Sequence, residues 1–375
     1  MATLGTAARN FTAISVGCAN VNEPCVSVII CNPNNPNQCQ TVTNIMVDTG
    51  SFGLRVFRSN VQGLNLPLSS TGSGTLAECQ PYVDNSSDWG PVAMAYVQIG
   101  DEKTKQAIPI QLIDSNFPVA GAAASAGCNN PDESPDQAHF NGILGVGLDV
   151  ADCGAGCAAT AFNMTYFSCG NSSCTGTKVP EGAPGTTLPV FQVSNPVAYM
   201  PTHNNGVVVA LPGIDTAGAG TAIGWLILGI GNEDNNSGGA GLSVFIPDSA
   251  DEIRTHFESH TYQAFLDTGS TALTFPAAGT SLTANSSGFY NPSGLSSFTA
   301  TLTDGSTSKQ EDFNILSADI ALSSFNPNVA FNDIGAQLSS LNAFDWGMPF
   351  FFGKTVFVGF EGMSSSIGSG KYWAY

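Results

Sequence analysis

The chain has 375 residues and is 42% hydrophobic, so it is longer than one core usually supports and apolar enough to fill two. Only 10% of the residues are charged, and 29 acidic against 10 basic residues give a formal net charge of -19. This balance excludes binding to nucleic acid through its phosphates, and it favours a working pH below neutral, where protonation relieves repulsion between carboxylates. No stretch approaches the roughly 20 apolar residues of a transmembrane helix.

Ten cysteines lie in the first half of the chain, and none forms a Cys-x-x-Cys pair. Their even number predicts up to five disulfides, and therefore an exported protein that is secreted, periplasmic or bound at the cell surface. Cys153 with Cys157, and Cys169 with Cys174, are spaced for short local loops. The alternative is that the cysteines are reduced and serve as small apolar residues. The ten residues are Cys18, Cys25, Cys31, Cys39, Cys79, Cys128, Cys153, Cys157, Cys169 and Cys174.

Short apolar runs bounded by Gly, Pro, Asn and Ser recur along the chain, and helical periodicity is rare. Alternation and β-branched or aromatic content predict strands and a mainly β fold. A helix is expected at Asp333–Leu341. Residues 151–187 are expected to form a Cys-rich surface insertion, and residues 232–241 a linker between an N-terminal lobe, 1–238, and a C-terminal lobe, 239–375. The predicted strands are Val26–Ile30, Ile45–Val47, Val92–Ile99, Ile108–Ile113, Val207–Leu211, Trp225–Ile230, Leu242–Ile246 and Phe350–Phe360.

One sequence pattern occurs twice, once in each half of the chain. Residues 44–54 read NIMVDTGSFGL, and residues 264–273 read AFLDTGSTAL. In both, an apolar strand leads into Asp-Thr-Gly-Ser, which places Asp48 and Asp267 at the ends of buried strands. A single copy is better explained by a turn in which Asp binds local backbone N–H groups. Two copies with the same flanks favour a shared function.

Two such loops that meet would bring the carboxylates of Asp48 and Asp267 to about 3 Å from each other, where both cannot ionise and the pair keeps one proton. One carboxylate then accepts a proton from water, and the other donates a proton to a peptide carbonyl. This chemistry needs no metal and no cofactor.

These motifs resemble those of the two-lobed, pepsin-like aspartic proteases, and the tail from Phe344 is similar to that of uncharacterised bacterial exported members. The resemblance implies a bilobal acid-protease fold with a central active-site cleft, and Asp48 and Asp267 as the catalytic dyad. It also implies support of the dyad by residues of the same loops. An apolar-apolar-Gly motif that packs behind each loop matches Phe140–Gly145 closely and Asp345–Gly347 poorly. The supporting residues are Thr49, Gly50, Ser51, Thr268, Gly269 and Ser270.

The family also covers its cleft with a β-hairpin flap that carries a tyrosine. Residues 78–100 are the expected flap, with Tyr82 or Trp89 as the capping aromatic. Both aromatics are explained equally well as ordinary cross-strand residues. Arg55 stands where the family usually has an aromatic residue, which puts the usual support of the flap tyrosine in doubt.

The expected function is therefore that of a monomeric aspartic endopeptidase, which cleaves polypeptides at acidic pH and is inhibited by pepstatin-type compounds. The main alternative is an exported pepsin-fold binding or adhesion module without turnover, favoured by Arg55, by the irregular Asp345-Trp346-Gly347 and by the insertion. A third possibility is a processing protease that acts on one exported protein.

Overall fold

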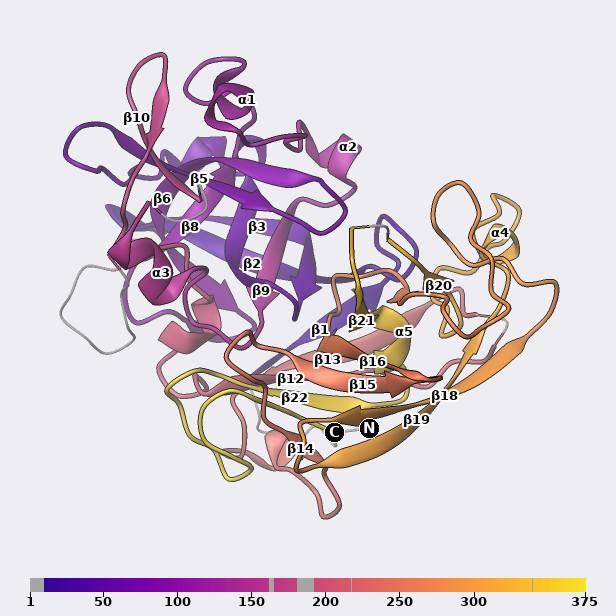
Figure 1. Cartoon of the computed structure of the whole chain (residues 1–375). Helices are drawn as coiled ribbons and strands as arrows, with labels where there is room; N and C mark the ends of the chain where they lie inside the picture. Colours follow the sequence, from indigo (N-terminus) through magenta and orange to yellow (C-terminus); the bar gives the residue numbers. More distant parts are fainter. Residues whose placement is uncertain (1–9, 162–164, 181–191, 217, 339) are drawn as a thin grey trace. The chain divides into compact units, whose positions relative to one another are not determined.

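The computed structural model describes residues 10–161, 165–180, 192–216, 218–338 and 340–375 (Figure 1). The chain is built mainly from β-strands with a few short helices, which confirms the predicted class. It divides into two compact units. Unit 1 comprises the chain up to Cys25, residues Asp48–Gly50 and Asn205–Tyr375, and unit 2 comprises Val26–Val47 and Ser51–Asn204.

This division differs from the expected boundary between residues 238 and 239. Strands β12 (Gly206–Ala210) and β13 (Ala222–Leu228) belong to unit 1, because β13 pairs with β1 (Phe11–Val16) and β12 pairs with β22 (Thr355–Gly359). The expected linker contains a short 3-10 helix, η5 (Asp234–Asn236), whose asparagines are buried. Asn235 Nδ2 donates to Asn10 Oδ1 at 2.8 Å, so this polar segment is fixed to the start of β1.

The sheet of unit 2 has the strand order β11-β10-β5-β6-β8-β4-β9-β3-β2, and β7 adds to β6. The long strand β6 pairs first with β5, then with β8, and at its end also with β2, which closes a barrel-like ring. The bounds of these strands are β2 (Pro24–Asn32), β3 (Asn35–Asp48), β4 (Phe52–Phe57), β5 (Thr75–Pro81), β6 (Ser87–Ile99), β7 (Glu102–Lys103), β8 (Ile108–Ile113), β9 (Gly142–Val146), β10 (Tyr166–Cys169) and β11 (Cys174–Gly176).

Unit 1 contains two sets of paired strands. One has the order β1-β13-β12-β22-β23-β14, and the other has the order β19-β18-β15-β16-β21-β17-β20. Their bounds are β1 (Phe11–Val16), β12 (Gly206–Ala210), β13 (Ala222–Leu228), β14 (Val244–Phe245), β15 (Ile253–Phe257), β16 (His260–Leu266), β17 (Leu273–Thr274), β18 (Ser296–Thr303), β19 (Ser308–Ile315), β20 (Gly335–Ala336), β21 (Ala343–Trp346), β22 (Thr355–Gly359) and β23 (Tyr372–Ala374).

Aromatic residues fill the core beneath the second of these sheets. Phe344 on β21 stacks on Phe275 with a centroid distance of 4.9 Å and on Trp346 at 4.4 Å. Phe257 contacts Phe275 and Phe344 edge-on. Aromatic pairs prefer particular ring orientations in addition to burial. These contacts therefore hold β21 in place beside the end of β16.

The described helices are short. The described residues of Asp333–Leu341 are not helical, so that prediction is wrong: Gly335 and Ala336 pair with β17, where a side chain at residue 335 would meet Ile315 and Tyr290. Phe350 and Phe351 belong to α5 instead of a strand, because Pro349 favours a first helical turn. The bounds are α1 (Ala122–Ala126), α2 (Pro135–Ala138), α3 (Gly154–Ala159), α4 (Ala318–Ala321), α5 (Met348–Phe351), η1 (Arg58–Asn60), η2 (Gln62–Leu64) and η4 (Pro196–Tyr199). None of the helices in the described ranges combines the length and the apolar character needed to cross a bilayer.

All ten cysteines form disulfides, as predicted, and the two local pairs are confirmed. The pairs are Cys18–Cys25, Cys31–Cys39, Cys79–Cys128, Cys153–Cys157 and Cys169–Cys174. The described part of the expected insertion, 151–187, is more than a surface loop, because β10 pairs with β5 and buries Tyr166 and Phe167. Residues 162–164 and 181–187 of that insertion lie outside the described residues.

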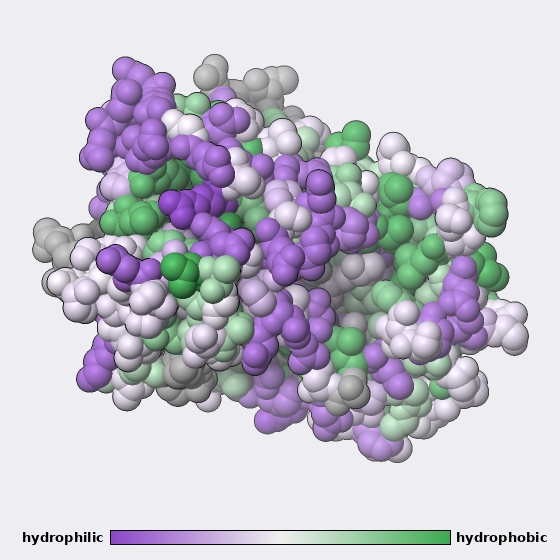
Figure 2. Space-filling model, turned by 90° about the horizontal axis from the view of Figure 1, so that it is seen from above, coloured by the Kyte–Doolittle hydropathy of each residue, from purple (hydrophilic) through white to green (hydrophobic). Residues whose placement is uncertain are grey.

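Few charges are available to cover the surface. The face in Figure 2 mixes hydrophilic and weakly polar residues with smaller apolar areas. Phe325 and Ile320, which lie beside and within α4, are 94% and 65% exposed, whereas most large apolar side chains are buried. Polar uncharged residues therefore do much of the solvation that charged residues do in other proteins.

Candidate active site

The two Asp-Thr-Gly-Ser loops have the same local geometry. Asp48 ends β3, and Asp267 directly follows β16. The Gly50 N–H donates to Asp48 Oδ1 at 2.8 Å, and the Gly269 N–H donates to Asp267 Oδ1 at 2.7 Å. The two aspartates are only 6% and 9% exposed. Both aspartates and their Thr and Gly neighbours belong to unit 1.

The threonines that follow the aspartates join the two loops. The Thr49 N–H donates to Thr268 Oγ1 at 3.1 Å, and the Thr268 N–H donates to Thr49 Oγ1 at 3.0 Å. Thr49 Oγ1 in turn donates to the Leu266 carbonyl at 2.8 Å. Both threonines are buried, so these bonds are shielded from water and hold the two loops in one arrangement.

The glycines allow each loop to approach the carboxyl group of the other. A Cβ on Gly50 would lie 2.6 Å from Asp267 Cγ, and a Cβ on Gly269 would lie 2.7 Å from Asp48 Oδ1. Both distances are too short for any side chain larger than hydrogen. Glycine is therefore required at these positions by close approach rather than by an unusual backbone angle.

The pKa of Asp267 lies well above its ordinary value. Burial is the largest cause, the negative charges of Asp48 and Asp345 add to it, and a hydrogen bond with the Asp48 carboxyl acts in the same direction. Ser270 opposes the shift, because its Oγ donates to Asp267 Oδ2 at 2.9 Å and stabilises the ionised form. The site therefore favours retention of a proton at Asp267.

A glycine motif packs behind each loop. Gly145 of β9 is paired with Gly53, and a side chain there would collide with the backbone of Phe52. A side chain at Gly347 would lie 2.0 Å from the Ala272 carbonyl oxygen. Met348 N–H also donates to the Ser270 carbonyl at 2.8 Å, so Asp345-Trp346-Gly347 does lie behind the second loop despite its poor match to the family motif.

A disulfide-closed loop, Cys18–Cys25, supports the second Asp-Thr-Gly-Ser loop. Asn22 in this loop donates to the Thr271 and Phe331 carbonyls at 2.8 and 2.9 Å, and its Oδ1 accepts from the Phe331 N–H at 2.7 Å. Its φ of 58° is left-handed, which asparagine tolerates better than most residues. The sequence alone does not point to this residue, since only the folded chain brings it to Thr271.

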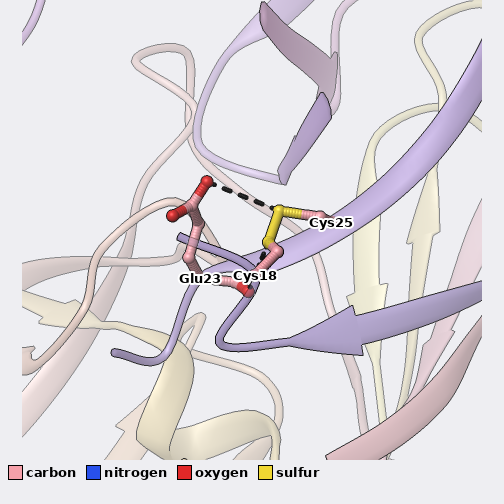
Figure 3. Close-up of side chains that lie close together, drawn as sticks. All are labelled: Cys18, Glu23 and Cys25. Atoms are coloured by element: carbon pink, nitrogen blue, oxygen red, sulfur yellow. Dashed lines mark hydrogen bonds between the residues drawn. A yellow bond between two sulfur atoms is a disulfide. The ribbon is translucent and has the colours of Figure 1, made fainter. Parts of the chain in front are cut away.

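Glu23 lies beside the same disulfide (Figure 3), with Oε1 3.4 Å from Cys25 Sγ. Burial raises the pKa of Glu23 to about 7, against the lowering effect of backbone N–H groups at Asn20 and Ala19. Cys18, Glu23 and Cys25 form the group of potential metal ligands in the described part of the chain. The two sulfurs are bonded to each other, however, and a disulfide does not supply the thiolate that a metal prefers.

The flap candidates lie on a hairpin of unit 2, formed by β5, a turn at residues 82–86 and β6. Tyr82 is half-buried, and its hydroxyl donates to Asp88 Oδ2 at 2.8 Å. Trp89 is fully buried, and its indole N–H donates to the Phe117 carbonyl at 2.7 Å. Trp89 is thus a core residue of its unit, which leaves Tyr82 as the aromatic near the hairpin turn.

Arg55, the departure from the family pattern, is fully buried in unit 2. Its Nη2 lies 2.7 Å from Glu78 Oε1 on β5 and 3.4 Å from Asp152 Oδ2. Burial is the largest influence and alone would lower the pKa of Arg55, but the negative charges around it, with that of Glu78 the strongest, together outweigh burial and raise this pKa. Ser51, the remaining loop residue, is buried, and its carbonyl accepts from the Gly147 N–H at 2.9 Å.

Residues 6–375 match one protein family, described as "Protein of unknown function (DUF3443)". No curated protein matches the chain.

Proposed function

This chain belongs to the DUF3443 family, and we propose that it is an aspartic endopeptidase in which Asp48 and Asp267 activate water for attack on a peptide bond. The observation that carries the proposal is the mutual approach of the two loops. Thr49 and Thr268 exchange hydrogen bonds, and each loop glycine lies against the carboxyl group of the other loop. A repeated strand-end turn would not require this arrangement.

The proposed reaction needs one ionised and one neutral carboxyl group. Burial and the neighbouring acids favour the neutral form of Asp267, so we assign the donor proton to Asp267 and the acceptor role to Asp48. Asp48 takes a proton from water as the water attacks the peptide carbonyl. Asp267 donates its proton to the carbonyl oxygen, which gives a diol. As the diol collapses, Asp48 passes its proton to the leaving amine and Asp267 takes a proton back from a diol hydroxyl.

The remaining expectations follow from the same assignment. We expect polypeptide substrates, an acidic optimum and inhibition by pepstatin-type compounds. The optimum is acidic because the dyad must keep one proton. The proposed fold is bilobal and pepsin-like, with the β5–β6 hairpin as its flap and Tyr82 as the capping aromatic. Five disulfides fit an oxidising compartment, and we propose a secreted or periplasmic monomer.

The test is hydrolysis of a denatured protein at about pH 3–5, with and without a pepstatin-type inhibitor. Asp48→Asn should lower the rate by at least about 100-fold, since it removes the proton acceptor. Asp215→Asn is a matched control, because Asp215 is an exposed acid of unit 1. Full activity of Asp48→Asn would refute the dyad. Binding of a protein partner without cleavage at any pH would instead favour the binding module.

A further inference from the structure

Two buried polar side chains on neighbouring strands reach the base of the β5–β6 hairpin, the proposed flap. Arg55 on β4 and Gln111 on β8 stand opposite each other in the parallel pairing of these strands. Gln111 Nε2 donates to the Glu78 carbonyl on β5 at 3.0 Å and to the Asp88 carbonyl on β6 at 3.1 Å. Both strands of the hairpin are therefore bound to the sheet at one place.

Arg55 binds side chains of the same hairpin. Its Nη2 donates to Glu78 Oε1 at 2.7 Å and to Gln80 Oε1 at 3.2 Å. These acceptors stand two positions apart on β5, so both side chains project from one face of that strand. In the other direction, Arg55 Nη1 donates to the carbonyl of Phe52, which directly follows Ser51 of the first Asp-Thr-Gly-Ser loop. One guanidinium group thus joins the hairpin to the end of that loop.

A second buried acid, Asp152, lies with its Oδ2 3.4 Å from Nη2 of the same guanidinium group. The Tyr166 hydroxyl on β10 donates to the Asp152 carboxyl at 2.8 Å and accepts from the Val193 N–H at 2.7 Å. Burial, and then the nearby charge of Glu78, raise the pKa of Asp152 well above its ordinary value. Glu78 is therefore the counter-ion of Arg55. Asp152 is a neutral neighbour that keeps its bond to Tyr166 whether or not the arginine is present.

Fold stability alone does not require a charged pair at this place. The side chains of Arg55 and Glu78 are fully buried, and in the described part of the chain Arg55 Nε and Glu78 Oε2 make no hydrogen bond. Removing two charges from water is costly, and apolar residues of similar volume often replace such a pair without loss of stability. An apolar pair would not supply directed hydrogen bonds to both β5 and the Phe52 carbonyl, so the charged pair is better explained by the geometry that it fixes.

We propose that Arg55 is a positioning residue, which holds the flap hairpin in a fixed place relative to the first Asp-Thr-Gly-Ser loop through its buried bonds to β5 and to the Phe52 carbonyl. This inference rests on the proposed function. All the residues that carry it belong to unit 2. It extends the proposed function by giving a role to Arg55, which departs from the family pattern.

The test separates positioning from stability by removing both charges together. Arg55→Met alone leaves Glu78 buried without a cation, so its urea midpoint should fall far below that of the wild type. Arg55→Met combined with Glu78→Leu leaves neither charge unpaired, and its midpoint should return close to the wild-type value. Gln111 still binds both strands of the hairpin in this double variant, but the bonds from residue 55 to the hairpin and to Phe52 are lost.

The double variant should bind substrate less well, because a flap that is not held in place closes less completely over it. We expect KM to rise about tenfold and kcat to stay within about threefold, since Asp48 and Asp267 are untouched. A role in stability alone would instead lower kcat through a smaller folded fraction and leave KM unchanged. That result, or wild-type values of both constants, would overturn the inference and leave the proposed function intact.

Arg55→Lys gives a second variant that keeps the cation for Glu78. A lysine ammonium is a single point and does not bind the hairpin and the Phe52 carbonyl together as the guanidinium fork does. This variant should therefore fold with near-normal stability and still show a KM raised about threefold or more. A wild-type KM for Arg55→Lys would show that the charge alone is sufficient and would overturn the inference, even if the double variant does not fold.

Arg58→Met combined with Asp114→Asn is the matched control. These residues form another ion pair of unit 2, with Arg58 Nη1 2.9 Å from Asp114 Oδ2, but their side chains are 42% and 24% exposed. A surface pair of this kind contributes little, so KM, kcat and the urea midpoint should stay near their wild-type values. An equal rise of KM in the control would mean that loss of any ion pair in this unit has the effect, and would also overturn the inference.

Hydrogen exchange of backbone amides provides a readout that needs no activity. In the double variant, amides of residues 78–90 should exchange about tenfold faster than in the wild type, whereas those of β12 and β13 in unit 1 should be unchanged. If the wild type cleaves nothing, the proposed function fails, but this comparison still decides whether Arg55 holds the hairpin. Equal exchange of residues 78–90 in both proteins would refute the positioning role.

Discussion

Thr49 and Thr268 are joined by two reciprocal hydrogen bonds, each from the backbone N–H of one residue to the side-chain oxygen of the other, at 3.1 and 3.0 Å. The two residues are 219 positions apart in the chain. Neither bond can form unless both loops are in place. The pair is therefore a sensitive probe of how the loops are held together.

Replacing Thr268 by Val should destabilise the protein, because the buried Thr49 N–H loses its acceptor. An unpaired buried donor costs about 1–3 kcal/mol, and we expect a loss of this size in the free energy of unfolding measured with urea. Thr49→Val should cost at least as much, since Thr49 Oγ1 also donates to the Leu266 carbonyl.

Thr268→Ser is the control for this prediction, because it keeps the hydroxyl and removes one methyl group. It should retain most of the stability that Thr268→Val loses. The double variant Thr49→Val with Thr268→Val should cost less than the sum of the two single changes, as expected for residues in one network. Equal losses in Thr268→Ser and Thr268→Val would show that packing, and not the hydrogen bond, is what matters.

The two Asp-Thr-Gly-Ser loops could be recognised from the sequence because their signal is local. In each copy, an apolar strand is followed directly by an acid, a hydroxyl residue and a glycine. The presence of two copies then indicates that they share a function. The strands were predicted for the same reason. The helix expected at 333–341 was wrong because Gly335 is set by contacts with Ile315 and Tyr290, which lie elsewhere in the chain.

Residues that act on the loops from outside them could not be predicted. Asn22 reaches Thr271 across 249 positions, and nothing near Asn22 in the sequence points to that contact. Asp345 was noticed only as a poor match to an apolar motif, although the structure places it against β16. The polar composition of 232–241 likewise predicts a linker, although Asn235 and Asn236 within it are buried.

Asn22→Gly should destabilise unit 1, and it isolates the side chain from the backbone. Glycine accepts the left-handed φ of 58°, so the change removes only the three side-chain hydrogen bonds. We expect a loss of about 2–3 kcal/mol in the free energy of unfolding. In an active enzyme, the rate should fall as well, since Thr271 directly follows Ser270.

Asn65→Gly is the matched control for Asn22→Gly. Asn65 also has a left-handed φ, 48°, but it is exposed and ends a short 3-10 helix. Its replacement should change the free energy of unfolding by less than about 0.5 kcal/mol. If both variants lose the same stability, the contacts of Asn22 with Thr271 and Phe331 do not brace the loop.

The Cys79–Cys128 disulfide should contribute more stability than any other in the described chain, because it closes the longest loop. The two cysteines are 49 positions apart, whereas Cys153 and Cys157 are four apart. If a disulfide stabilises the fold by restricting the unfolded chain, these two disulfides contribute about 4 and about 2 kcal/mol, respectively.

Replacing both members of each pair by Ala, and measuring urea unfolding of the two double variants, tests this difference. Cys79 and Cys128 pack in the core with Trp89 and Phe167, and Cys157 packs with Tyr166 and Val193, so both double variants also leave a cavity. A larger loss for the Cys153–Cys157 pair would contradict the prediction, and would mean that α3 and its surroundings depend on that short link in the folded state.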